Sequence, residues 1–393
     1  MKITKVSCHL CTASLGGYQA GSAIIRVETD AGLTGHGESL IGLFCAPIAP
    51  VLVKYFDPLL LHRDPAAIED LWRLMYDSSS WWGRQGDAVS VLGAIETALW
   101  DIQGQALGVP CYQLIGSAPR TSIPVYASLG PSAGDAETLR RTVDRVQAAG
   151  FRAFKSGLQF GVMGENRFYT PKGDELLRMV DAMLTDLRRI VGDDLLVGVD
   201  GHMGGVPAPI NRELALQVAR ILEAHGVAFF EEPLDYLDPA GYAWLRGQTS
   251  VPISGGESLS LVEGFGVFLD QEALDIVQPD VNWVGGLQRA AEVIQLAQSR
   301  GLAAMPHAWC GGPGIMANLH LAFAFQSTLR LEMPVAFTDL QLATLIDPPR
   351  IVDGEISAPT APGLGIRFDA SIAEKFPYVE GLVERASGLM GFR

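Results

Sequence analysis

The chain of 393 residues lacks the long apolar segments that mark membrane proteins. No uninterrupted apolar stretch reaches the roughly 20 residues that a helix needs to cross a bilayer. The N-terminal MKITKVSCHLC alternates polar and apolar residues, as a strand does, and has no signal-peptide core. Basic residues are too few to balance the acidic ones, and a formal net charge of −15 makes a surface that repels phosphate backbones. We therefore expect neither a membrane nor a nucleic acid as partner.

Cysteine is also scarce, at five residues in 393. The set is odd in number and dispersed, which is typical of a protein in the reducing cytoplasm, where we expect this one. Cys8 and Cys11 form a C-x-x-C, but on a strand they point to opposite faces, and no second cysteine pair follows to complete a zinc site. We interpret them as ordinary packing residues.

What the chain has, from residue 123 onward, is an alternation of short apolar runs with amphipathic stretches. Three of the amphipathic stretches, at 136–150, 211–226 and 287–301, end in glycine, a normal helix stop. The apolar runs are short and mostly uninterrupted, as strands buried on both faces should be. They lie at 123–128, 151–155, 195–200, 227–232, 251–257, 274–280, 302–307 and 328–333. Eight such units predict an α/β protein with a closed parallel barrel, and an open doubly wound sheet is the structural alternative.

The two ends of the chain differ from this pattern. Residues 1–122 predict antiparallel strands around a D-A-G turn, followed by three helical stretches. Residues 346–393 resume short strand-like pieces and turns. We predict an α+β capping domain at 1–122, a catalytic barrel at 123–345, and a C-terminal segment that returns to the cap. The segments SLGGYQAGS and GLFCAPIAP are expected to be cap loops over the barrel mouth, and 156–174 an ordered loop at the site.

Ionisable residues end five successive strands, at a stride of 31, 26, 23 and 27 residues: Asp200, Glu231, Glu257, Asp280 and His307. That stride is about the length of one strand–helix unit. In a parallel barrel these groups would share the face that carries the chemistry. Three carboxylates without thiolate or imidazole favour a hard cation such as Mg²⁺. The alternative, polar residues that simply cap strand ends, leaves three acidic groups to repel one another.

His307 and Asp280 end adjacent strands, so the carboxylate can orient the imidazole as a general base. The alternative is a buried histidine with a structural role. His202 lies two residues past Asp200 and so points the same way. It can protonate a leaving hydroxyl, and it can equally be a polar loop residue or an unusual metal ligand.

Three further residues have weaker patterns. Lys155 ends its strand and can neutralise a substrate carboxylate or an enolate, with a lysine at a solvated rim as the alternative. Glu332, in RLEM on the eighth strand, can hydrogen-bond a developing enolate. Arg84 follows two tryptophans in SSSWWGRQG and is a candidate for the substrate pocket, against the simpler interpretation of two packed indoles and a surface arginine. Together these groups suit removal of a proton next to a carboxylate that a divalent cation holds.

At this point the chain resembles the mandelate racemase branch of the enolase superfamily, over nearly its whole length. The resemblance rests on AIETALWDIQGQALGVPCYQLIG, VD-G-H, FFEEP, GGES, VQPD…GG, MPH and PGLGI. It implies a (β/α)7β-type barrel and a homo-oligomer. The ligands of that family end the third, fourth and fifth barrel strands, which correspond here to Asp200, Glu231 and Glu257. The family's His–Asp dyad corresponds to His307 and Asp280.

Glu332 corresponds to the family's eighth-strand glutamate, after a stretch at 309–320 that looks like an insertion.

Two departures from the family pattern bear on the reaction. Racemases carry Lys-x-Lys on the second strand, and here Gly157 stands in place of the second lysine. His202 stands where many members have asparagine, which resembles the galactonate and mannonate dehydratases. Elimination needs one base and an acid, whereas racemisation needs a second base.

The sequence therefore predicts a Mg²⁺-dependent dehydratase of acid sugars, aldonates or aldarates, that yields a 2-keto-3-deoxy acid. His307 as both base and acid is the fallback if His202 is not the acid. A racemase, epimerase or lactone cycloisomerase is the alternative within the family, if Tyr169 or Lys172 serves as a second base. A non-catalytic ligand-binding barrel is the alternative from another class.

Overall fold

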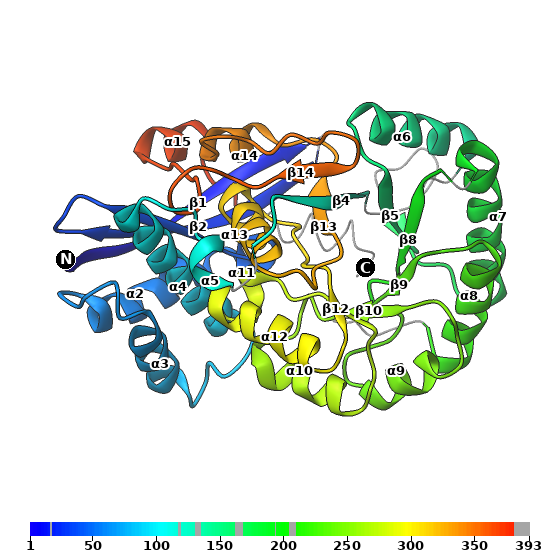
Figure 1. The fold of residues 1–393 in the computed structure, drawn as a ribbon, viewed down its shortest axis with the longest axis horizontal. Coiled ribbons are helices and arrows are strands. Elements are labelled where there is room, and N and C mark those ends of the chain that lie inside the picture. Colours follow the sequence, from blue (N-terminus) through cyan, green and yellow to red (C-terminus); the bar gives the residue numbers. More distant parts are fainter. Residues whose placement is uncertain are drawn as a thin grey trace.

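The fold is known from a computed structural model, which describes residues 1–15, 18–116, 119–129, 135–161, 168–192, 194–203 and 210–380. Figure 1 shows two regions side by side, with the N-terminal strands and helices at one end and a ring of helices around curled strands at the other. Each region has its own apolar core. Among the described residues, no helix combines the length and apolar character that crossing a bilayer requires.

The N-terminal region is an antiparallel sheet covered by helices. Its strands are β1 (Ile3–Leu15), β2 (Tyr18–Thr29) and β3 (Thr34–Ser39), paired in that order. Gly32, with φ of 78°, forms the predicted turn between β2 and β3. The helices are α1 (Ile41–Cys45), α2 (Ile48–Leu60), α3 (Ile68–Ser79), α4 (Asp87–Leu107) and α5 (Tyr112–Ile115). The segment GLFCAPIAP, predicted as a loop, is therefore α1 and the start of α2.

Eight strands form a parallel sheet that curls into a barrel (Figure 1). They are β4 (Ser122–Ser128), β5 (Ala153–Gly157), β8 (Leu196–Asp200), β9 (Phe229–Glu231), β10 (Ile253–Gly255), β11 (Ile276–Val277), β12 (Ala303–Ala304) and β13 (Leu331–Pro334). Each lies within one of the eight predicted runs or within two residues of its limits. β4 pairs with β13, and a parallel bridge between Ala304 and Thr328 joins β12 to the segment that leads into β13. The alternative of an open doubly wound sheet is therefore wrong.

Helices surround the barrel strands: α6 (Ala136–Ala148), α7 (Asp174–Val191), α8 (Arg212–Ala224), α9 (Pro239–Arg246), α10 (Leu261–Asp270), α12 (Leu287–Ser299) and α13 (Gly312–Ala324). Glycines at 150, 226 and 301, all with positive φ, follow α6, α8 and α12 as predicted. The stretch 309–320, which looks like an insertion in the sequence, is mostly α13, the ordinary helix between β12 and β13.

The C-terminal part connects both regions. Short α14 (Asp339–Thr344), β14 (Glu355–Ser357) and α15 (Ala370–Lys375) follow the barrel, and β14 pairs antiparallel with β4. Further on, Pro377 bridges to Cys11 of β1, and Val379 N donates to Thr12 Oγ1. The tail thus returns to the N-terminal sheet, as expected, while the domain limits at 122 and 345 stay predictions.

Two expected loops are only partly described. In SLGGYQAGS, residues 14–15 end β1 and residues 18–22 begin β2, so most of this predicted loop is strand, and residues 16–17 lie outside the described residues. Residues 162–167 of the 156–174 loop also lie outside them. On either side of the second gap, β6 (Phe160–Gly161) and β7 (Phe168–Tyr169) pair antiparallel. The short helix α11 (Val281–Val284), which follows β11, completes the set of described elements.

Candidate functional site

The carboxyl ends of β8, β9 and β10 bring three acidic side chains together. Asp200 and Glu231 are the last residues of β8 and β9 and stand opposite each other in the parallel register. Glu257 follows β10 by two residues. One carboxylate oxygen from each of the three lies within 4.8 Å of the others. Because the ends of parallel strands meet at one edge, residues 57 positions apart converge on a single point.

This carboxylate cluster fits a divalent cation. Its donors are hard oxygens only, and Asp200 and Glu231 are buried while Glu257 is half-buried and open to an incoming ligand. Burial raises the pKa of Glu231 well above its ordinary value, and the neighbouring Asp200 charge adds to the rise. A bound cation would offset this repulsion, which is the physical reason for such a cluster to hold a metal.

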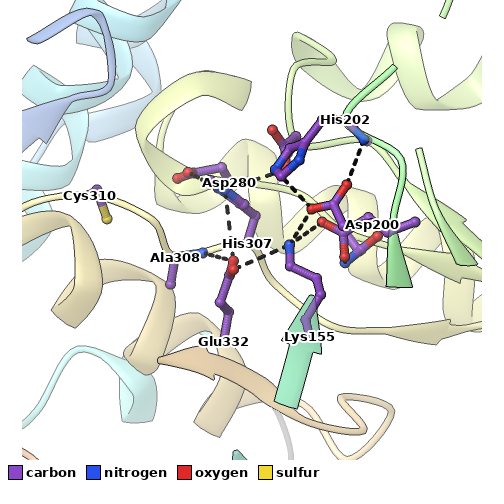
Figure 2. A network of polar contacts seen from close by, with 12 residues as sticks. Lys155, Asp200, His202, Asp280, His307, Ala308, Cys310 and Glu332 are labelled. Carbon is purple, nitrogen blue, oxygen red and sulfur yellow. Dashed lines mark hydrogen bonds and ion pairs between the residues drawn. The ribbon is translucent and has the colours of Figure 1, made fainter. Parts of the chain in front are cut away.

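Lys155, near the end of β5, lies among carboxylates (Figure 2). Its Nζ is 2.9 Å from Asp200 Oδ2 and 3.3 Å from Glu332 Oε1, and it also pairs with Glu231 Oε1. Burial alone would lower the pKa of this ammonium, but Asp200, Glu231 and Glu332 outweigh it and hold the pKa well above its usual range. The lysine is only 4% exposed, so the alternative of a solvated rim is wrong.

Gln278 contacts the same cluster and was missed in the sequence analysis. Its Nε2 donates to Glu231 Oε2 at 2.6 Å, while Lys155 pairs with Oε1. Both oxygens of Glu231 therefore have protein partners that set the orientation of the carboxylate. A signal was present in VQPD, because Gln278 stands two residues before Asp280, which puts both on one face of the run 274–280 that the sequence predicts as a strand.

His307 and Asp280 lie together as predicted. Asp280 Oδ2 is 2.6 Å from His307 Nδ1, so Nε2 is the ring nitrogen that faces the carboxylate cluster, 3.4 Å from Glu257 Oε2. Burial would lower the pKa of His307, but Glu257, Glu332 and Asp280 outweigh it and raise the pKa well above its ordinary value. His307 is buried beside the carboxylates, and its catalytic role, like the alternative of a structural role, stays a prediction.

The orientation of Asp280 is set by two asparagines that sequence reasoning missed. Asp280 Oδ1 accepts hydrogen bonds from Asn282 N at 2.8 Å, from Asn282 Nδ2 at 2.7 Å and from Asn318 Nδ2 at 3.0 Å. Asn318 comes from α13, with no motif around it that marks a functional residue. Because Oδ1 is occupied by donors, Oδ2 is left to face the imidazole.

Glu332 of β13 joins the two halves of the site. Its Oε1 is 3.3 Å from Lys155 Nζ, and its Oε2 accepts from Ala308 N at 3.0 Å and lies 3.8 Å from His307 Nε2. Burial raises the pKa of this carboxyl, but Lys155 and His307 outweigh it and bring the pKa to about 2. Glu332 thus lies between the Lys155 ammonium and the His307 imidazole (Figure 2).

His202 lies beside Asp200 of the carboxylate cluster. Its Nε2 is 3.1 Å from Asp200 Oδ2, and its backbone N donates to Asp200 Oδ1 at 2.8 Å. The backbone of His202 is left-handed, with φ of 53°, a conformation that few side chains adopt without a local reason. Burial raises the pKa of Asp200, but His202 and Lys155 outweigh it and bring the pKa to about 2.

Arg84 is not brought to this cluster. It follows α3 on the exposed surface, where Nε donates to Ser80 O at 2.7 Å. Trp82 packs edge-on against Tyr55, whereas Trp81 is 98% exposed, so the interpretation of two packed indoles is wrong for Trp81. A place for Arg84 in the substrate pocket stays a prediction.

The fold and the site together define an enzyme class that comparison with known proteins identifies. Residues 4–116 match the family described as Mandelate racemase / muconate lactonizing enzyme, N-terminal domain. Residues 138–372 match the family described as Enolase C-terminal domain-like. The chain therefore belongs to the mandelate racemase/muconate lactonizing enzyme family of the enolase superfamily, with an N-terminal capping domain and a C-terminal barrel.

Relatives in this family carry several activities in their names. The chain is 32% identical over 355 residues to an arabinonate dehydratase from Saccharolobus solfataricus, with 89% of each chain covered. It is 30% identical to a D-galactonate dehydratase from Xanthomonas oryzae pv. oryzae, covering 89% of this chain and 90% of the relative. The solved 3,6-anhydro-D-galactonate cycloisomerase from Zobellia galactanivorans superposes with a TM-score of 0.82 at 27% identity, covering 96% and 99%.

Proposed function

We propose that this enzyme is a Mg²⁺-dependent hydro-lyase that removes water from an acid sugar, an aldonate or an aldarate, to give a 2-keto-3-deoxy acid. The observation that carries the proposal is the contact of His307 with Asp280 at one ring nitrogen while the other faces the carboxylate cluster. The relatives named as dehydratases of arabinonate and D-galactonate support the same reaction class.

The base is His307. Its Nε2 takes the proton from the carbon next to the substrate carboxylate, and Asp280 holds the ring and offsets the positive charge that it gains. Asp200, Glu231 and Glu257 would hold the metal ion. When bound, the ion would act as a Lewis acid that offsets negative charge growing on the substrate carboxylate. Lys155 and Glu332 lie beside this position and would orient the substrate oxygens.

The acid is His202, which would protonate the hydroxyl on the third carbon as the C–O bond breaks. The electron pair of the broken C–H bond forms the new double bond between the second and third carbons, and the hydroxyl leaves as water. The resulting enol becomes the 2-keto-3-deoxy acid when its third carbon takes a proton and its hydroxyl loses one. Gly157, at the end of β5, stands in place of a second lysine base, so the lysine that would return a proton to the opposite face of the substrate in a racemase is absent. This absence favours elimination over racemisation.

The test is a screen of aldonic and aldaric acids with Mg²⁺, assayed for 2-keto acid and followed by proton NMR in deuterium oxide. We expect loss of water from at least one acid and exchange of its α-proton. A product with the same composition as the substrate would instead identify an isomerase. Failure of every acid to exchange its α-proton would support a non-catalytic barrel.

Lactone cycloisomerisation is the second candidate, because the Zobellia galactanivorans relative is named for it. That reaction would need another proton donor in the loop after β5. Lys172, one of the two candidates for a second base, is exposed to solvent. The same NMR experiment distinguishes the two reactions, since only dehydration releases water.

A further inference from the structure

A small cavity lies between the capping domain and the barrel segments that follow His307 and Glu332. Its volume is about 60 Å³, several times the roughly 10–15 Å³ that one water molecule needs. Ala13 and Ala20, paired across β1 and β2, form part of the cap wall with Leu43. Ala308 and Pro334 form part of the barrel wall. The cavity thus has room for the end of a small substrate.

The cavity adjoins the proposed base. Ala308 follows His307 in the chain, and its backbone N donates to Glu332 Oε2 at 3.0 Å. Pro334 stands two residues beyond Glu332 on β13. In Figure 2 the chain runs from His307 through Ala308 toward Cys310, which also lines the cavity. The cavity therefore borders the segments that carry His307 and Glu332.

The walls of the cavity offer mainly carbon. Ala13, Ala20, Leu43, Ala308, Ile315 and Pro334 present alkyl groups. None of the described residues that line the cavity is basic. A second carboxylate at the far end of a substrate would therefore lose its hydration without gaining a cationic partner, which is costly.

The hydroxyl and amide side chains of the lining are already bound within the protein. Ser22 Oγ donates to Glu38 Oε1 at 2.5 Å. Thr338 Oγ1 accepts from Gln341 N, while Gln341 Oε1 accepts from Thr338 N and Gln341 Nε2 donates to Cys310 O. A substrate hydroxyl in this cavity would have to share one of these oxygens or pair with the Thr338 hydroxyl or the Trp309 indole, whereas a methyl group needs no partner.

Glu38 fixes this arrangement. It accepts from Gly311 N at 3.0 Å and Gly314 N at 3.1 Å in addition to Ser22, and so ties the cap sheet to the start of α13. A Cβ on Gly311 would lie 2.2 Å from Glu38 Oε1, so a larger residue there would displace the carboxylate. The cavity wall is therefore held by bonds that cross between the two regions.

We propose that the cavity receives an alkyl end of the substrate, so that the enzyme acts on ω-deoxy aldonates, which end in a methyl group. Aldonates with a terminal hydroxyl and aldarates with a second carboxylate are the disfavoured classes. The inference rests on the proposed function for the type of reaction. The preference for a methyl end is a difference in binding affinity and can be measured without turnover. A carbon-lined pocket discriminates against an added hydroxyl by about 10- to 100-fold.

Matched pairs of acids test the preference. The pairs are D-galactonate with 6-deoxy-D-galactonate, L-galactonate with 6-deoxy-L-galactonate, and L-mannonate with 6-deoxy-L-mannonate, with D-galactarate as the aldarate. Binding is measured by calorimetry on His307→Asn with Mg²⁺, because removal of the base prevents turnover. We expect the deoxy member of at least one pair to bind about 10- to 100-fold tighter than its partner, and galactarate to bind weakest.

Two variants assign the preference to the cavity. Ala20→Ser and Ala13→Ser, each in the His307→Asn background, put a hydroxyl into the cap wall and should reduce the preference by about tenfold. Ala358→Ser is the matched control and should leave the preference unchanged. Ala358 is a half-buried alanine that follows β14 and does not line the cavity. The inference is overturned by equal binding within every pair, by tighter binding of the hydroxylated member, or by no binding of any acid. It is also overturned by a preference that both cap variants leave intact.

Wild-type turnover separates this inference from the proposed function. If the deoxy acids bind with the expected preference and none loses water or exchanges its α-proton, the dehydratase proposal fails and the assignment of the cavity stands. If water is lost from acids that show no preference for the methyl end, the reaction stands and the cavity assignment fails.

Discussion

Asp280 and His307 are joined by a contact of 2.6 Å between Oδ2 and Nδ1. Because three donors from Asn282 and Asn318 occupy Oδ1, the carboxylate cannot turn away without breaking them. The imidazole is thereby held with Nε2 toward Glu257, the residue of the carboxylate cluster that it contacts. If His307 is the base, this geometry predicts how variants of the site behave.

Replacing His307 with asparagine should remove the base and leave the metal ligands in place. We expect kcat for water loss to fall by about 10²- to 10⁴-fold, the usual contribution of one acid–base group. Mg²⁺ affinity, measured by calorimetry, should stay within a few-fold of wild type. Near-normal turnover in this variant would show that another group takes the proton.

His202→Asn should separate proton removal from water loss. Asparagine tolerates the left-handed backbone at this position, so the loop should keep its shape. We expect water loss to slow by roughly 10²-fold while exchange of the α-proton with deuterium oxide continues. Proton NMR measures both rates on the same sample. Equal loss of both rates, at unchanged metal affinity, would exclude His202 as the acid and favour His307 in both roles.

Gln278→Leu should weaken metal binding. Its Nε2 supplies the one neutral side-chain hydrogen bond to Glu231 that the structure describes, at 2.6 Å, and loss of such a partner typically costs 10- to 100-fold in metal affinity. Calorimetry with Mg²⁺ measures the change directly, without any substrate. Gln271→Leu, at an exposed position that ends α10, is the matched control. Unchanged affinity in Gln278→Leu would mean that Lys155 alone orients Glu231.

Glu96 predicts a pH dependence of stability that is independent of the site. This carboxyl of α4 accepts from the N–H groups of Leu287, Gln288 and Trp100, yet its complete burial raises the pKa to about 7, from 4.5. The unfolded chain releases the proton near pH 4.5 and the folded chain near pH 7. The stabilising contribution is therefore full below pH 4.5 and lost as the pH rises through 7.

The size of this effect is about 3 kcal/mol at most, since each unit of pKa is worth about 1.4 kcal/mol. It is measured as the difference in free energy of unfolding between wild type and Glu96→Gln, by urea denaturation from pH 4.5 to pH 8. We expect the wild type to lose stability relative to the variant as the pH rises. A difference that does not change across this range would show that folding does not raise the pKa of Glu96.

Much of the barrel could be predicted from the sequence because its strands are short apolar runs that each end in a turn. Asp200, Glu231 and Glu257 were predictable for the same reason, since a parallel register puts the residue at the end of each strand at one edge. The prediction failed where local pattern was ambiguous: residues 309–320 look like an insertion because their small and apolar residues lack the polar face of a surface helix. In the structure α13 is buried along its length.

The sequence by itself determined which chemical groups this protein has and the order in which the strands present them, because strand period and helix stops are local properties. Only the tertiary structure decided which groups touch. The burial of Lys155 among three carboxylates, the donors from Gln278 and Asn318, and the carbon-lined cavity between Ala20 and Ala308 each join residues far apart in the chain. Such contacts follow from how the strands curl and how the cap sheet meets α13, and no local periodicity encodes either.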